Sequence, residues 1–407
     1  MGSSSTRIRL SARTLSALGS GLGLARWFPL EEEWVLEQAQ NRTGLTDWGD
    51  DAFREPLGLL LAEARRVEPP LLGRIGMLET LLRAVANRMR VRDALRRDPE
   101  IAAIHVASPV FVIGLRGTGF RALHRLLASL PGLRGLRFWE TLHPAPPLEG
   151  ERDTRIRDAR DLLRVGGWLA PELAAMDRME PEAVDECWPL FFPTFQVPSV
   201  AVRNDVPAYA QWLWRQDARP AYRWLASALR LLLRQGPREQ LVLAAPDHLW
   251  FLDALLDVFT DANVVWVHRD PAACVAVTAR VATLTRRTVA GRADPTEVGP
   301  GVAERVALGL WRAMGTRRSG DTRFVDVAHA DLVRDPVRVA RAVAEGFELP
   351  WTDAHEKAAR AWAAASGAIP VPTASPAEYA VDPEAWMERF SAYRERFGVP
   401  EEALAPK

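Results

Sequence analysis

The chain is 407 residues long, 48% of them apolar and 26% charged, a composition that suits one large globular domain or two smaller ones. Its formal net charge is zero, so the sequence predicts neither nucleic acid nor an anionic membrane surface as a partner. Two cysteines exclude a disulfide framework, no Cys/His cluster has the spacing of a metal site, and no apolar run could span a bilayer, which favours a cytoplasmic protein without a bound metal.

The first part of the chain has the periodicity of helices. Segments such as Leu57–Arg66 and Ile75–Arg90 repeat apolar residues at three-to-four spacing, and Asp50 and Asp51 precede the first of them as caps. The sequence predicts a helical N-terminal extension over residues 1–105. It packs on a second unit, residues 106–407, and the two form one compact body.

The pattern changes after Ser108, where short apolar runs alternate with helical segments. The run Pro109–Gly114 is typical of a strand buried on both faces, and a helix at Phe120–Leu130 follows it. Strands alternating with helices predict an α/β fold with a parallel sheet flanked by helices, and ligands at the carboxyl ends of the strands. The further predicted strands are Leu133–Phe138, Leu241–Leu243, Val264–Val267 and Arg323–Val327, and a loop rich in Gly and Pro is predicted at Arg286–Gly301.

The middle section, residues 150–235, is helical and unusually aromatic. Two interpretations stay open: the rings fill the core, or some of them line an apolar substrate pocket. The candidate pocket residues are Trp188, Phe191, Phe192, Phe195 and Trp212.

The turn after the first strand reads Gly114-Leu115-Arg116-Gly117-Thr118-Gly119. Glycines let the backbone approach a ligand, and a helix N-terminus behind such a turn can direct several N–H groups at an anion. The turn lacks the Gly-Lys-Ser/Thr of nucleoside triphosphate sites. We take Gly114, Arg116, Gly117, Thr118 and Gly119 as candidate anion-binding residues.

This turn and three later motifs, in the same order, resemble the bacterial branch of the PAPS-dependent sulfotransferases. The resemblance covers residues 40–350, and it implies a P-loop-related, sulfotransferase-like fold. It also implies that PAPS lies over the first strand–loop–helix while an acceptor hydroxyl approaches from a hydrophobic pocket. The segments that carry it are Pro109–Ala128, Trp139-Glu140 with Pro144–Pro147, Leu241–Leu249 and His268–Pro271.

The loop departs from the family's usual Gly-Leu-Pro-Arg-Thr-Gly-Thr-Thr. Arg116 stands at the proline position and Gly117 at the position of the cation, whereas Thr118-Gly119 matches. The paired hydroxyls are replaced by Phe120-Arg121. Arg116 and Arg121 could reach the same anion from neighbouring positions, so Arg121 joins the candidate cofactor residues.

The later motifs are altered as well. Where the family reads Leu-Lys-Ser-Pro-Glu-His, this chain has Ala244-Ala245 in place of Lys-Ser and keeps Pro246–His248. Arg269 matches the family's ligand of the 3′-phosphate, while the serine that shares this phosphate is Val277, with Thr278 one place on. Sulfuryl transfer depends on donors placed around developing charge, and losing one such donor costs ~3 kcal/mol. The sequence therefore predicts an altered PAPS site, and either no cofactor or PAPS.

Three polar residues are candidates for acid–base chemistry. His248 matches the family's general base, and Glu140 and His143 follow the second predicted strand, where they could face the same cleft. Asp177, Asp185 and Glu186, near Cys187, could approach the cleft as well, but a solvated helix face is the favoured interpretation.

The sequence supports three functional hypotheses. The favoured one is a repurposed enzyme of the sulfotransferase fold that acts on a hydrophobic small molecule of secondary metabolism by cyclisation, isomerisation or elimination. The alternatives are PAPS-dependent sulfuryl transfer to a hydroxyl of a hydrophobic acceptor, and a ligand-binding pseudoenzyme without catalysis. The oligomeric state, the substrate's identity and the choice among these hypotheses stay open at this point.

Overall fold

The computed structural model describes residues 23–177 and 179–402. Its centre is one sheet of five parallel strands in the order β2-β3-β1-β4-β5. The predicted α/β class and parallel sheet are therefore confirmed. The strands are β1 (Val110–Gly114), β2 (Leu133–Gly135), β3 (Gln240–Ala244), β4 (Asn263–His268) and β5 (Phe324–Ala328).

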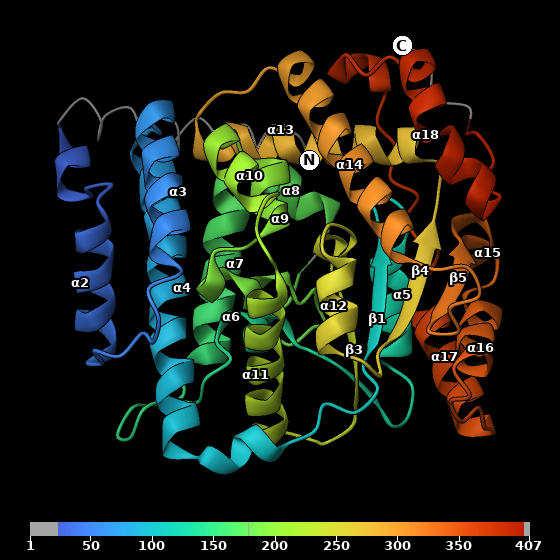
Figure 1. Cartoon of the computed structure of the whole chain (residues 1–407), viewed down its shortest axis with the longest axis horizontal. Coiled ribbons are helices and arrows are strands. Elements are labelled where there is room, and N and C mark those ends of the chain that lie inside the picture. The colour runs from blue at the N-terminus through green and yellow to red at the C-terminus, as the bar shows by residue number, and fades with distance from the viewer. Residues whose placement is uncertain (1–22, 178, 403–407) are drawn as a thin grey trace.

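Helices cover both faces of this sheet, as Figure 1 shows. All five residues of β1 are buried, and successive side chains point to opposite faces. Val110 and Val112 pack with α5 (Phe120–Leu127), α16 (Pro336–Gly346) and α17 (Asp353–Ser366). Phe111 and Ile113 pack into the larger core on the other face. The apolar run read from the sequence is thus a strand buried on both sides.

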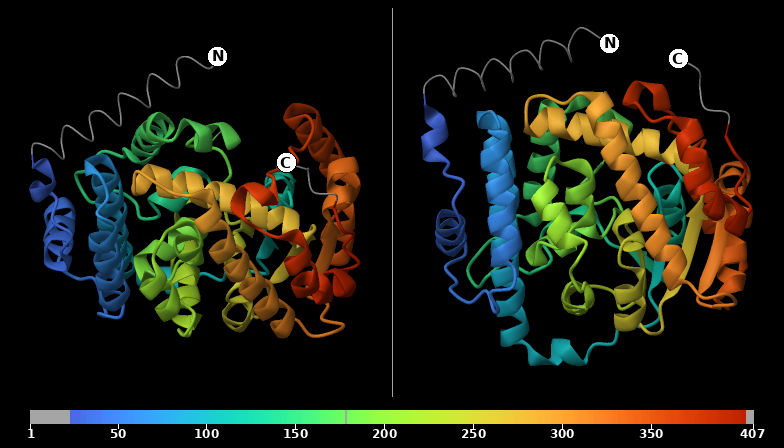
Figure 2. Two further views of the ribbon diagram at one scale, coloured as in Figure 1. Left: turned by 90° about the horizontal axis from the view of Figure 1, so that it is seen from above. Right: turned by 45° about the horizontal axis from the view of Figure 1, so that its top comes forward.

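The N-terminal helices form one end of the molecule, shown in blue in Figures 1 and 2. Val35 and Leu57 of these helices belong to the same hydrophobic cluster as Phe111 of the sheet. The helical N-terminal region is therefore present, while its division from the rest at residue 105 stays a prediction. Its elements are η1 (Leu24–Trp27), α2 (Glu32–Thr43), α3 (Arg54–Val67), α4 (Leu71–Arg97) and η2 (Pro99–Ala103).

The middle section is built of short helices broken by prolines. The predicted strand Leu133–Phe138 is wrong at its end, because a helix begins at Phe138. The Glu140 carboxylate accepts the backbone N–H of Arg137 at 2.8 Å, and this cap starts the helix. The elements are α6 (Phe138–Leu142), α7 (Arg155–Leu169), α8 (Pro171–Met176), η3 (Trp188–Thr194), α9 (Pro198–Arg203), α10 (Pro207–Leu213), α11 (Arg219–Gln235), η4 (Pro246–Leu249) and α12 (Leu252–Val258).

The C-terminal part folds back over the carboxyl edge of the sheet. The loop predicted at Arg286–Gly301 is wrong, since α13 (Pro271–Val289) and α14 (Pro295–Thr316) leave only five residues between them. Pro295 is the first residue of α14, where a proline is tolerated. No helix in the described part of the chain is long and apolar enough to cross a membrane. The remaining elements are α15 (His329–Arg334), η5 (Pro376–Tyr379) and α18 (Pro383–Phe397).

Candidate active site

Three loops meet at the carboxyl edge of the central strands, because β1 lies between β3 and β4. The first runs from Gly114 to Gly119 and leads into α5. Gly117 and Gly119 have φ angles of 98° and 84°, a conformation that favours glycine. The hydroxyl of Thr118 donates to the Leu115 carbonyl at 2.8 Å and closes the turn. This is the backbone geometry that the glycine pattern predicts.

The two arginines of this loop point at acidic side chains of the protein. Arg121 Nε lies 3.0 Å from Glu186 Oε1, its Nη2 lies 2.5 Å from Asp185 Oδ1, and its Nη1 pairs with Asp177. Arg116 Nη2 lies 3.3 Å from Glu186 Oε2. Both candidate cations are therefore neutralised by protein carboxylates.

Glu186 is the centre of this charge cluster, and its residue is only 2% exposed. Burial alone would raise the pKa of its carboxyl, but the guanidinium groups of Arg116, Arg121 and Arg203 outweigh burial and lower it. The interpretation of Asp185-Glu186 as a solvated helix face is wrong. The carboxylates of Asp185 and Glu186 lie inside the protein because Arg116 and Arg121 are partly buried there and need counter-ions.

Arg269 follows β4 and joins the loop to the end of the chain. Its Nη1 donates to the carbonyls of Gly117 at 2.8 Å and Pro372 at 3.0 Å. Its Nε and Nη2 form a bidentate pair with the Glu402 carboxylate at 2.7 and 2.8 Å. The backbone N–H of Glu402 in turn donates to Asp270 at 2.9 Å. Every side-chain nitrogen of Arg269 is thus occupied by the protein itself.

The helix after Arg269 presents little polarity to the loop. A Cβ placed on Gly117 would lie 3.5 Å from a methyl group of Val277, so that side chain faces the loop. The hydroxyl of Thr278 donates to the carbonyl of Cys274, one turn back, at 2.7 Å. Its hydrogen is therefore used within α13 (Pro271–Val289).

His248 follows β3 and is fully enclosed, with an exposed fraction of 0%. Its Nε2 lies 3.3 Å from Cys187 Sγ, and its Nδ1 is hydrogen-bonded to the Tyr222 hydroxyl at 2.8 Å. The rings of Phe111 and Phe191 meet it edge-on. Burial lowers the pKa of His248 to about 3, so the imidazole is neutral at physiological pH.

Asp247, the residue before His248, is bonded to Ser199 at the wall of a cavity. Asp247 Oδ1 accepts the Ser199 backbone N–H at 2.7 Å, and Oδ2 accepts the Ser199 hydroxyl at 2.5 Å. Burial raises the pKa of Asp247, and the bonds from Ser199 only partly offset this shift. Ser199 also lines the cavity, so its hydroxyl lies between the cavity and a carboxylate of raised basicity.

This cavity has a volume of about 280 Å³ and is bounded by α3, α4, η3, α9 and α13. Trp188 and Phe192, two of the predicted pocket residues, line it. Phe191 and Phe195 lie in the core instead, with exposed fractions of 3% and 0%, and Trp212 stacks on Tyr209. Trp188 and Phe192 thus line an apolar cavity while Phe191 and Phe195 fill the core, and a substrate in that cavity stays a prediction.

Glu140 and His143 have surroundings of their own. The Glu140 carboxylate pairs with Arg134 and caps α6. His143 lines a hollow between α4 and α7, where burial, followed by repulsion from Arg83, lowers its pKa to about 4. Neither residue lines the apolar cavity.

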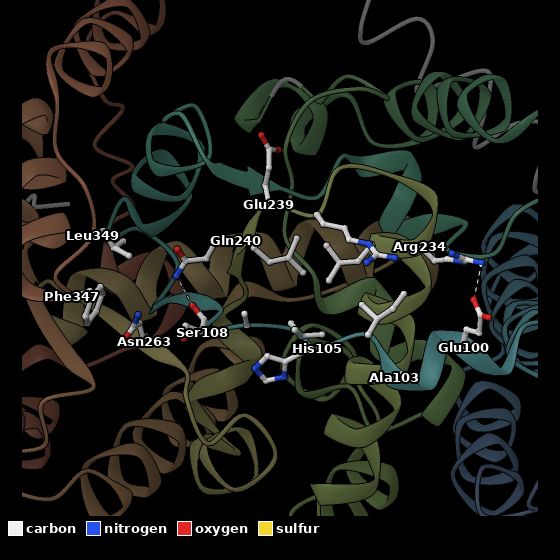
Figure 3. A pocket seen from close by; sticks show the side chains of 16 residues that line it. Glu100, Ala103, His105, Ser108, Arg234, Glu239, Gln240, Asn263, Phe347 and Leu349 are labelled. Carbon is white, nitrogen blue, oxygen red and sulfur yellow. Dashed lines mark hydrogen bonds and ion pairs between the residues drawn. The ribbon is translucent and has the colours of Figure 1, made fainter.

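A larger hollow, about 750 Å³, opens at the opposite edge of the sheet (Figure 3). Ser108, Gln240 and Asn263 stand there at the amino ends of β1, β3 and β4. Gln240 uses its amide to donate to the Ser108 carbonyl at 2.6 Å. Ligands of parallel sheets bind at the carboxyl ends, so we place the candidate site at the loop and the apolar cavity.

The fold is an α/β sheet with a glycine turn after its first central strand, and the same molecule holds an apolar cavity. The model of the sulfotransferase family matches residues 109–353, which is more than half of the chain. The chain therefore belongs to the sulfotransferase family, as the sequence motifs predict.

Two solved structures are similar over nearly the whole chain. Sulfotransferase STF9 from Mycobacterium avium is 27% identical, with a TM-score of 0.79 and coverage of 91% of this chain and 97% of that one. Sulfotransferase STF1 from Mycobacterium tuberculosis H37Rv is 28% identical, with a TM-score of 0.74 and coverage of 89% and 98%. Among curated proteins, no sequence matches this chain.

Several residues of the site escaped prediction from the sequence. Ser199, Arg203 and Tyr222 lie in the aromatic section, whose pattern of Trp and Phe does not point to them. Asp247 was read as part of the motif Pro246–His248, without a role of its own. Glu402 is 133 residues from Arg269 along the chain and carries no local signal.

Proposed function

We propose that this enzyme of the sulfotransferase family acts on a hydrophobic small molecule of secondary metabolism without transferring a sulfuryl group. Its chemistry is acid–base catalysis, such as cyclisation, isomerisation or elimination. The proposal rests above all on one observation: every arginine at the loop is already paired with a carboxylate of the protein. Arg116 and Arg121 share Glu186, and Arg269 holds Glu402.

PAPS is the cofactor that the family implies, and the residues present do not fit it. The family's lysine position is Ala244, which is fully buried and offers no cation. Adding the phosphates and the sulfonate of PAPS beside Glu186 would place like charges together in a buried site, which is unfavourable. We therefore derive no step through PAPS.

The acid–base role falls to the groups that reach the apolar cavity. Ser199 lines the cavity wall, and its hydroxyl is bonded to Asp247, whose raised pKa makes it a stronger base than an ordinary aspartate. A proton leaving the substrate passes to Ser199 Oγ while the Ser199 proton passes to Asp247. His248 stays neutral and does not take part in this transfer. It holds the side chains of Cys187 and Tyr222 through its two ring nitrogens.

The apolar walls suit a hydrophobic substrate. Burial of apolar groups supplies the binding free energy, and the burial of Ser199 and Asp247 strengthens the hydrogen bond between them. The cavity volume of about 280 Å³ lies near the lower end of small-molecule pockets, ~300–1,000 Å³. A compact substrate is therefore expected.

PAPS-dependent sulfuryl transfer is the second candidate, and the loop backbone favours it. Gly117 and Gly119 keep the turn that directs N–H groups at an anion, and α5 begins directly behind it. The family relationship supports the same reading.

The test is a calorimetric titration of the full chain with PAP, the nucleotide product of sulfuryl transfer. A family member with intact motifs is titrated under the same conditions. We expect no binding up to millimolar PAP. Micromolar affinity that Arg269→Ala weakens would overturn the proposal and favour sulfuryl transfer instead.

A further inference from the structure

Arg203 is a cation at the wall of the apolar cavity, and most of its N–H groups have no hydrogen-bond acceptor among the described residues. It is the last residue of α9 and lines the cavity. Its one hydrogen-bond contact within the described residues is long, 3.5 Å from Nη2 to Ser199 Oγ, and it forms no ion pair there. Its guanidinium lies 4.9 Å from the centre of the Trp188 ring. Most of its N–H groups therefore remain available to a ligand.

The other charged side chains of the cavity wall are already used by the protein. Arg286 donates to the carbonyls of Arg203 and Asn204, both at 3.2 Å. Glu63 and Asp205 both pair with Arg66. Among the charged residues described on this wall, Arg203 is the one with open donors.

Among the residues that the structure describes, no carboxylate forms an ion pair with Arg203, although Glu186 and Asp247 lie near enough to favour its charged form. Burial, followed by repulsion from Arg116, lowers the pKa of Arg203 to about 9, which leaves it charged at neutral pH. The nearby carboxylate of Glu186 is occupied by Arg116 and Arg121. The carboxylate of Asp247 also favours the charged form of Arg203, but its two oxygens already accept bonds from Ser199. Arg203 itself is held only by a long hydrogen bond and an aromatic ring, so its remaining donors can bind an anionic group in the cavity.

We propose that the substrate is an apolar molecule that carries one carboxylate, which binds Arg203 while the apolar body lies between α4 and α13. This inference rests on the proposed function of the same cavity and names its substrate class. Because Arg203 stands beside Ser199, the carboxylate places the neighbouring carbon atoms of the substrate next to the Ser199–Asp247 pair.

The probes are decanoate, methyl decanoate and decan-1-ol, which share an apolar chain and differ in the head group. Each is titrated calorimetrically into the full chain at pH 7.5. We expect decanoate to bind at least about 10-fold more tightly than either neutral probe, the effect of a charge-assisted hydrogen bond. Equal affinity for the three probes would overturn the inference without any mutation.

Two variants locate the effect. Arg203→Gln should abolish the preference for decanoate while leaving the affinity for decan-1-ol within about 2-fold, since the apolar walls are unchanged. Arg286→Gln removes a guanidinium from the same wall, and it should keep the preference because the backbone already holds that group. A preference that survives Arg203→Gln would refute the assignment.

The two proposals fail separately. Micromolar binding of PAP together with a decanoate preference would overturn the acid–base reaction and leave the substrate class standing. No binding of PAP and no decanoate preference would overturn the substrate class alone.

Discussion

At the scale of single residues, the site is governed by which carboxylate holds which arginine. Arg269 is only 4% exposed and binds Glu402 with two nitrogens, an arrangement that joins charge to a planar geometry. An anion that approaches the loop must compete with this carboxylate. The side chain of Glu402 therefore controls whether the loop has a free cation.

Glu402→Gln should release Arg269 and bring PAP binding, which we expect to be absent up to millimolar in the unaltered chain, into the measurable submillimolar range, because a charge-assisted hydrogen bond contributes ~1.5–3 kcal/mol. Calorimetric titration measures the change. Glu401→Gln, at an exposed neighbour, is the matched control and should leave PAP binding unaltered. Equal PAP affinity in both variants would show that the pair of Arg269 and Glu402 does not limit the access of PAP to the loop.

The parts of the candidate site that depend on residues adjacent in the sequence could be predicted. The positive φ angles of Gly117 and Gly119 follow from the glycine pattern of a turn between a strand and a helix. The partners of Arg121 were not predictable, since Asp177 and Asp185 reach it only through tertiary folding. The outward placement assigned to these acids ignored the need of a buried arginine for counter-ions.

At the scale of elements, the apolar cavity depends on how closely α4 and α13 approach. A Cβ on Gly73 of α4 would overlap the backbone carbonyl of Val289 in α13. Gly76, one turn further along α4, has open space at the same position. These two glycines thus separate the effect of packing from the effect of helix propensity.

Gly73→Ala should lower the free energy of unfolding by ~1–3 kcal/mol, because the helices must move apart. Gly76→Ala should raise it by up to ~1 kcal/mol, since alanine favours a helix more than glycine does. Urea unfolding followed by circular dichroism gives both values. The same sign of change in both variants would contradict the packing argument.

Element boundaries failed where one capping contact decided them. The strand predicted to continue to Phe138 gives way to α6 because Glu140 caps the Arg137 N–H. An unbroken run of β-branched and aromatic residues forms most of β1 and β4, so both strands were predicted to within one residue at each end.

At the scale of the whole molecule, buried histidines make stability depend on pH. His248 and His124 are 0% and 1% exposed, and burial lowers their pKa values to about 3 and about 4. In the unfolded chain, a histidine binds a proton near pH 6.5. The unfolded state therefore binds more protons below that pH, and stability is lost as the pH falls from 6.5 towards 4.

Between pH 7 and pH 5, each of these two histidines should cost about 2 kcal/mol of stability. Urea unfolding at pH 7, 6 and 5 should therefore show a clear loss. His124→Asn should reduce the loss by about 2 kcal/mol, whereas His105→Asn, at an exposed side chain, should not change it. A loss that His124→Asn leaves intact would assign the pH dependence to other groups.

The rates at which the two cysteines are alkylated can report how often the interior of the site opens. Cys187 lies against His248, and Cys274 lies in α13, the helix that follows Arg269. Both thiols are buried, and burial raises the pKa of each, so alkylating reagents must wait for the protein to open. In Cys274→Ser, the labelling rate of Cys187 reports opening of the core behind the cavity. In Cys187→Ser, the labelling rate of Cys274 reports opening of α13 near the pair of Arg269 and Glu402. A ligand that binds one of these two regions should slow the labelling of the cysteine in that region and leave the labelling rate of the other cysteine unchanged.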